Sequence, residues 1–137
     1  MPIAYRLDRD ARVVVAVGHG VLTDHDVFDY QHGVWSRADV VGFDELIDMT
    51  RVNEVAMPSV DRVRDLAAVA ASMDAAGRHS RLAIVASTDF VYGLGRMFQA
   101  HRQLDAKSTK VVGVFRTMDE ALAFLGLTRP PEMPALA

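Results

Sequence analysis

The feature that most constrains the fold is a continuous apolar run, Leu-Ala-Ile-Val-Ala, at residues 82–86. A strand without polar alternation is typical of a parallel sheet whose two faces are both covered by helices. Amphipathic helical patterns lie on either side of this run, at about residues 58–77 and 89–104. The run therefore predicts an α/β protein with this strand inside its sheet.

Shorter segments supply the other strands. Residues 4–7 and 12–17 predict two strands joined by a polar turn, and Gly18 and Gly20 are expected to end the second one. The two strands must pair antiparallel, because a parallel crossover needs a dozen or more residues. Further strands are expected at 45–49 and 110–115.

Capping signals mark the first and last helices. Thr23 and Asp26 form a capping-box pattern ahead of a helix that reaches about residue 38. Thr117 begins a short final helix that ends at Gly126.

The resulting order, β-β-α-β-α-β-α-β-α, predicts one domain over residues 1–127. Its sheet is mixed and mostly parallel, with an N-terminal antiparallel hairpin and four helices. Residues 128–137 include three prolines and are expected to form a disordered tail.

Composition narrows the function classes. The 137 residues include no cysteine, which excludes disulfides, a thiol nucleophile and cysteine-ligated metals. A net charge of −3 without a basic stripe argues against nucleic-acid binding. We find no signal peptide and no apolar stretch long enough for membrane insertion, so a cytoplasmic location is expected.

One polar group resembles a metal site. His25, Asp29 and His32 share a face of the first helix, but this face is opposite the apolar stripe. We therefore interpret the trio as the solvated side of the helix and expect no metal and no other cofactor.

The helix at 89–104 is the most informative segment. Gly93 and Gly95 lie inside it and cost about 1 kcal/mol each relative to alanine. Close approach of the backbone to a strand, a partner subunit or a ligand would explain them. Tyr92, Arg96 and Met97 flank the glycines, and these five residues, together with Asp48 and Arg51 at the strand ends, are our seven main candidates for a ligand or interface site.

A polar rim is expected at the carboxyl ends of the strands, where ligands bind in parallel sheets. Asp48 and Arg51 belong to it and are expected to pair with each other. The other members are His19, Gly20, Thr50, Ser87, Thr88, Arg116 and Thr117. The chain contains no nucleophile elbow, phosphate loop or zinc-protease motif, so we expect no enzyme.

Three segments together carry a family resemblance. They are Gly-Val-Leu-Thr-Asp at 20–24, Ile-Asp-Met-Thr-Arg-Val at 47–52, and Tyr-Gly-Leu-Gly-Arg-Met-Phe at 92–98. The chain resembles the SpoIIAA-like (STAS/SEC14-type) group of small bacterial proteins from about residue 3 to residue 127. The resemblance implies a compact mixed sheet with helices and no assigned activity for most members.

The resemblance also implies a position for a phosphorylatable serine, which anti-sigma-factor antagonists carry at the start of a helix. Ser59 is the positional candidate here, although the preceding Asp and the following Gly-Leu of the motif are absent.

Three functions remain open from the sequence. The first is a non-catalytic regulatory or protein-interaction module, expected to be a homodimer. The second is a carrier of a small apolar ligand or lipid, held between helix 89–104 and the sheet. The third is an enzyme that uses the strand-end rim.

Overall fold

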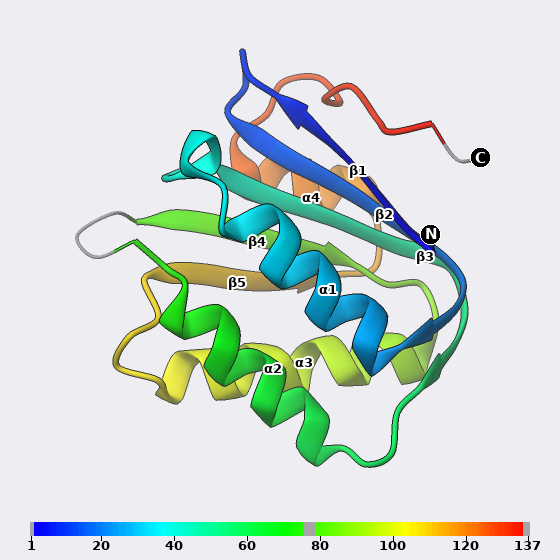
Figure 1. Ribbon diagram of the computed structural model, residues 1–137. Helices are drawn as coiled ribbons and strands as arrows, with labels where there is room; N and C mark the ends of the chain where they lie inside the picture. Colours follow the sequence, from blue (N-terminus) through cyan, green and yellow to red (C-terminus); the bar gives the residue numbers. More distant parts are fainter. Residues whose placement is uncertain (1, 76–78, 136–137) are drawn as a thin grey trace.

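The computed structural model describes residues 2–75 and 79–135. In chain order the elements are β1 (Ile3–Asp8), β2 (Val13–Thr23), α1 (Asp24–Trp35), a 3₁₀ turn η1 (Ala38–Val40), β3 (Asp44–Ala56), α2 (Asp61–Ser72), β4 (Ser80–Val85), α3 (Asp89–Leu104), β5 (Lys110–Phe115) and α4 (Met118–Leu125). Figure 1 shows their arrangement.

The five strands form one sheet in the order β1-β2-β3-β4-β5. β1 pairs antiparallel with β2, and every other neighbouring pair is parallel. The predicted fold class, a mixed and mostly parallel sheet with an N-terminal hairpin and four helices, is confirmed.

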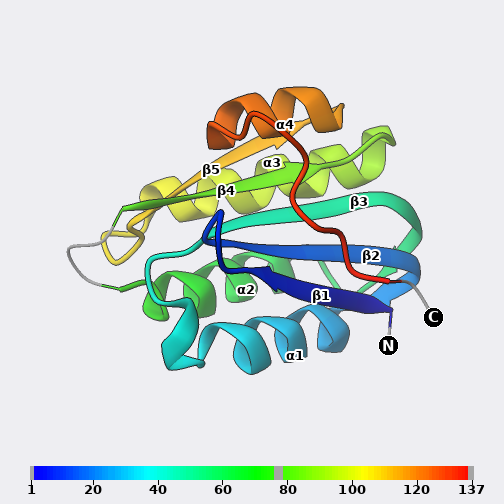
Figure 2. The same cartoon turned by 90° about the horizontal axis from the view of Figure 1, so that it is seen from above.

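The helices divide unequally between the two faces of the sheet. Three helices, α1, α2 and α3, lie on one face, and α4 lies on the other (Figures 1 and 2). Within β4, Leu82 and Ile84 pack toward α2 and α3, whereas Ala83 and Val85 pack toward α4. This alternation within a wholly apolar run is what a strand buried on both faces requires.

The two glycines of β2 do not end the strand, so that prediction is wrong. β2 continues to Thr23 beside a β3 that reaches Ala56, well beyond the predicted end at residue 49. Register shifts fall between Val17 and His19 and again after Gly20, whose φ is +69°. At both shifts β3 carries one residue more than β2, so the irregularities are bulges of β3 opposite the two glycines, and the ladder continues past them. Local pattern in β2 does not distinguish this arrangement from a break.

The helix ends follow their capping signals closely. Thr23 and Asp26 form the predicted capping box, and Thr117 accepts a hydrogen bond from the backbone of Glu120. Gly126 ends α4 in the left-handed conformation, with φ of +71°, as predicted.

Helix α2 is shorter than predicted. It begins at residue 61, where the carbonyls of Ser59 and Val60 and no side-chain cap close the first turn, and it ends at residue 72. Gly77, the predicted end, lies outside the described residues. Ser59 is exposed in the loop before this helix.

Residues 128–135 form no helix or strand and cross the sheet on the α4 side (Figure 2). Glu132 lies 2.7 Å from Arg6 of β1, and Pro131 is buried. Disorder of this segment in solution stays a prediction. Within the described ranges, the helices are all too short or too polar to cross a membrane.

Candidate functional site

An apolar cavity of about 120 Å³ lies between the sheet and the three helices α1, α2 and α3. Sixteen residues line it, and thirteen of them are apolar or glycine. These thirteen are Val27, Ile47, Met49, Val55, Met57, Val63, Leu66, Leu82, Ile84, Val91, Leu94, Gly95 and Phe98. The three polar members are Tyr30, Gln31 and Glu45.

The side-chain periodicity of strands and helices explains why the lining residues lie together. Glu45, Ile47 and Met49 alternate along β3 and therefore share the face under the helices. On α3, Val91, Gly95 and Phe98 follow the helical spacing of four and three residues, and all three are buried. The cavity is thus a product of regular secondary structure and not of an irregular loop.

A buried polar cluster adjoins the cavity. The Glu45 carboxylate accepts a hydrogen bond from the Tyr30 hydroxyl at 2.7 Å and one from the Trp35 indole at 3.0 Å. Its other oxygen lies 3.3 Å from the Lys110 ammonium, which also sits 3.2 Å from the centre of the Trp35 ring. The Glu45 and Lys110 side chains are only 4% and 7% exposed, so this is a buried ion pair with three hydrogen-bond donors on one carboxylate.

Burial, the Glu45 charge and the hydrogen bond to Glu45 together raise the pKa of the Tyr30 hydroxyl well above its ordinary value of 10.0. Folding therefore disfavours tyrosinate, and the unfolded chain releases the Tyr30 proton at lower pH than the folded one. We expect stability to be fully present below pH 10 and to fall as pH rises above it. Urea unfolding from pH 8 to 11 should show that the free energy of unfolding falls less with pH for Tyr30→Phe than for the wild type. The same pH dependence for both proteins would contradict this account.

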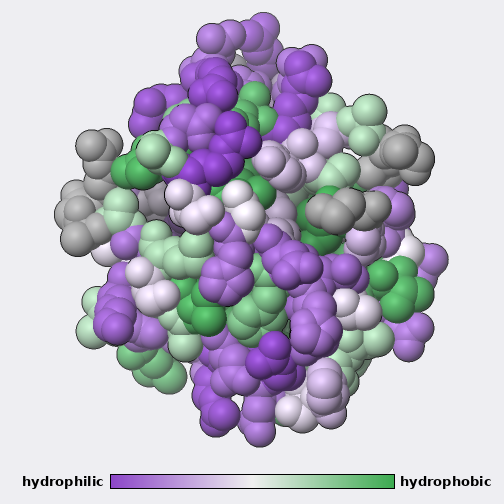
Figure 3. Space-filling model, in the orientation of Figure 1, coloured by the Kyte–Doolittle hydropathy of each residue, from purple (hydrophilic) through white to green (hydrophobic). Residues whose placement is uncertain are grey.

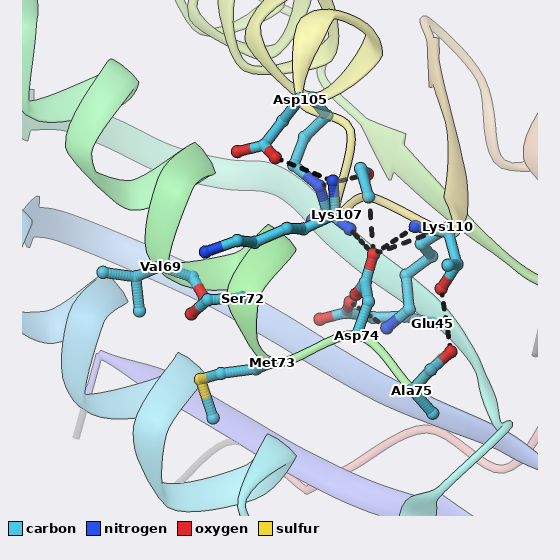
Figure 4. Close-up of polar contacts among 12 residues, drawn as sticks. Glu45, Val69, Ser72, Met73, Asp74, Ala75, Asp105, Lys107 and Lys110 are labelled. Carbon is cyan, nitrogen blue, oxygen red and sulfur yellow. Dashed lines mark hydrogen bonds and ion pairs between the residues drawn. The ribbon is translucent and has the colours of Figure 1, made fainter. Parts of the chain in front are cut away.

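Lys110 connects the first cluster to a second one. Its backbone N–H donates to the Asp74 carboxylate at 3.1 Å, beside the N–H of Thr109 at 2.9 Å. The same oxygen of Asp74 pairs with Arg102 at 2.5 Å, and the Asp74 and Arg102 side chains are 6% and 3% exposed. Figure 4 shows Asp74 at the centre of these contacts, with Glu45 and Lys110 beside it. Asp74 thereby fixes the start of β5 and with it the position of the Lys110 ammonium.

Two side-chain bridges join α1 to α2 above the cavity. Asp24 pairs with Arg62 at 2.8 Å, and Gln31 donates to the Met73 sulfur at 3.6 Å. The hydrogen bond from Arg62 lowers the pKa of the Asp24 carboxyl. Between the bridges, wall residues Val27 and Leu66 are only half-buried, and apolar side chains reach the surface between the two helices (Figure 3).

The two glycines of α3 have different surroundings. A Cβ on Gly95 would lie 3.0 Å from a methyl of Val114, so close packing on β5 explains this glycine, which also lines the cavity. A Cβ on Gly93 would meet nothing within 4 Å. Close approach to a strand is therefore confirmed for Gly95. Gly93 approaches no strand of the described chain, and close approach to a partner subunit or a ligand stays a prediction for it.

We expect Gly93→Ala to raise the free energy of unfolding by about 1 kcal/mol, because alanine gains helix propensity without a clash. Gly95→Ala gains the same propensity but pushes against Val114, so it should be less stable than Gly93→Ala by about 1–3 kcal/mol. Urea unfolding of the two variants provides the measurement. Equal stabilisation by the two substitutions would show that Val114 of β5 moves away from the added methyl group at little energetic cost.

The remaining α3 candidates lie outside the cavity lining. Helical spacing predicts Tyr92 on the outer side of α3, but the residue is half-buried beneath Arg116, whose guanidinium lies 4.1 Å from the Tyr92 ring centre. Arg96 is exposed, and Met97 packs partly against the α2–α3 core. Helical spacing predicts Phe90 on the same side of α3 as Leu94 and Phe98, but the structure leaves Phe90 62% exposed.

The strand-end rim forms local pairs and not one cluster. Asp48 accepts hydrogen bonds from the backbone and hydroxyl of Thr50 and not from Arg51, which is exposed, so the predicted pairing is wrong. An Asp side chain readily accepts a hydrogen bond from the backbone N–H two residues further along, because little chain entropy is lost, and this favours the local contact with Thr50 over one with Arg51. Arg116 pairs with Asp89 at 2.9 Å.

Sequence reasoning missed Glu45, the residue with the most buried contacts at the cavity. A signal was present, since Glu45 shares a period of two with Ile47 and Met49 and so places a charge on a core-facing side. Its partners lie 10, 15 and 65 residues away, which no local pattern reveals.

An N-terminal hairpin, a sheet in sequential order, three helices on one face and one on the other together define a SpoIIAA-like fold. A solved structure carries this likeness: the crystal structure of an uncharacterized protein of the DUF3478 family with a SpoIIAA-like fold from Shewanella loihica PV-4. It shares 17% sequence identity over 90% of this chain and 93% of that chain, with a TM-score of 0.57. No family model and no curated protein matches the sequence. The fold expected from the sequence resemblance is therefore confirmed.

Proposed function

We propose that this protein is a non-catalytic binding module whose α1–α2–α3 cavity takes a small, mainly apolar molecule. The observation that carries the proposal is the cavity itself, since thirteen of its sixteen lining residues are apolar or glycine. An engineered apolar cavity of about 150 Å³ binds benzene, so about 120 Å³ is in the range of a small aromatic compound.

The exposure of the lining supports the proposal. Val27 and Leu66 of the lining are only half-buried, so the unoccupied site leaves apolar side chains in contact with water. A ligand that covers this surface would remove it from water and would stabilise the folded state by mass action.

Native mass spectrometry of freshly purified protein, with thermal unfolding in the presence of benzene, tests the proposal. We expect either a co-purified small molecule or a rise in Tm with benzene. Val63→Phe should fill the cavity and abolish the rise, because Val63 lines it, whereas Val111→Phe on the outer edge of β5 should retain the rise. The absence of both a co-purified molecule and a Tm rise would contradict the proposal.

We also propose a protein-interaction role through the outer face of α3, with a second copy of the chain as the partner. Phe90 and Leu104, near the two ends of α3, are 62% and 86% exposed, and a Cβ on Gly93 between them would meet nothing within 4 Å. Large exposed apolar side chains are a feature of interaction surfaces. Light scattering at micromolar concentration tests it: a dimer that Leu104→Glu dissociates supports the role, and a 15.0 kDa monomer contradicts it.

A further inference from the structure

The polar residues of the cavity lining lie on one side of it, and they determine which hydrogen-bonding group a ligand needs. Tyr30, Gln31 and Glu45 are the polar residues of the lining, and all three come from α1 and the start of β3. The wall contributed by α2 and α3 consists of apolar residues and Gly95. A molecule in the cavity therefore meets hydrogen-bonding groups on one side only.

The hydrogen bonds around Glu45 indicate that its carboxyl is ionised. Tyr30, Trp35 and Lys110 all donate to it, and a protonated carboxyl would add a donor where these three need an acceptor. An ionised carboxylate has about four acceptor positions. Three are occupied within residues 2–75 and 79–135, two on one oxygen and one on the other, so one acceptor position is left on the oxygen that faces Lys110.

The charges of the Glu45 cluster also limit which net charge a ligand can carry. The charges of Glu45 and Lys110 cancel, and both side chains are buried. A carboxylate ligand would add an unpaired negative charge next to Glu45 in a low-dielectric setting, which is strongly unfavourable. A cationic ligand would likewise leave a net charge buried, whereas a neutral hydroxyl adds only a donor.

We propose, as an extension of the proposed ligand-binding function, that the ligand class is a neutral apolar molecule with one hydroxyl or N–H donor, and that Glu45 is the specificity-determining residue that accepts this donor. Phenols, small apolar alcohols and indole belong to this class. Fatty acids and aromatic carboxylates do not.

Three probes of similar ring size test the preference for a hydroxyl group separately from the binding of an apolar molecule, which is the proposed function on which this inference rests. Benzene, phenol and benzoate would be titrated into the full-length protein at pH 7 and followed by amide chemical shifts. We expect phenol to bind at least tenfold more tightly than benzene, as a hydrogen bond to a charged group provides. We expect benzoate to cause no saturable shifts. Equal affinity for phenol and benzene, or tight binding of benzoate, would overturn the inference and leave the apolar site standing. No binding of any probe would overturn both.

A variant links the preference to Glu45. Glu45→Met alone leaves the Lys110 ammonium buried without its partner and endangers folding. The double variant Glu45→Met/Lys110→Met removes both charges and keeps apolar bulk, and its folding is checked by circular dichroism. In the folded double variant the phenol-to-benzene affinity ratio should fall to within threefold of unity. Retention of the tenfold ratio would show that another group accepts the hydroxyl.

Discussion

Replacing Glu45 by alanine is expected to lower the free energy of unfolding by about 3–5 kcal/mol, because it leaves a buried ammonium without a partner. The Tyr30 hydroxyl and the Trp35 indole lose their acceptor at the same time. Chemical unfolding monitored by Trp35 fluorescence gives the measurement. Glu54→Ala is the matched control, since Glu54 lies exposed on the same strand and should change stability by less than about 0.5 kcal/mol.

The double variant Glu45→Met/Lys110→Met distinguishes a broken ion pair from lost packing. Removing both charges eliminates the unpaired ammonium, and hydrophobic replacement of a buried pair is often neutral or stabilising. We therefore expect the double variant to recover the part of the stability loss that comes from the unpaired ammonium, while the Tyr30 hydroxyl and the Trp35 indole still lack their acceptor. A double variant that is as unstable as Glu45→Ala would mean that the charges are not the source of the effect.

The second large effect is expected at Asp74, where alanine should also cost about 3–5 kcal/mol. The substitution leaves the buried Arg102 guanidinium without a carboxylate and removes the acceptor for the N–H groups of Thr109 and Lys110. Because those two groups begin β5, amide exchange should accelerate there first. Asp10→Ala in the exposed turn between β1 and β2 provides the control.

Protection of the Lys110 amide from hydrogen exchange shows whether Asp74 anchors the start of β5 locally or only contributes to the stability of the whole domain. If Asp74 fixes the start of β5, Asp74→Asn should keep one acceptor oxygen and retain more of that protection than Asp74→Ala. Equal loss in the two variants, or a uniform acceleration across the whole sheet, would contradict a local anchoring role.

Elements whose ends carry local signals were predicted closely. The structure places α3 at residues 89–104 and β5 at residues 110–115, both as predicted, and Thr88 caps α3 through its side chain. Strand pairing over long range explains the main errors. Residues 19–23 of β2 are held by residues 51–56 of β3, and this pairing carries the strand through glycines that would otherwise end it.

The candidate site could be predicted only in part. The sequence alternative of an apolar ligand between α3 and the sheet stays a proposal, but α3 and the sheet do contribute to the cavity lining, because the apolar face of α3 is visible in the sequence. Among the seven main candidates, however, only Gly95 lines the cavity. The walls from α1 and α2 and the role of Glu45 depend on how separate elements pack, which single-sequence periodicity does not encode.

The most direct test of the central claim is a crystal structure of the protein soaked with benzene. We predict electron density for one ring inside the cavity, in contact with Ile47, Leu82 and Leu94. The surrounding backbone should not move, because the space already exists in the folded protein. A cavity closed by its own side chains, or a ring bound only elsewhere, would contradict the claim that this protein is built to hold a small apolar molecule.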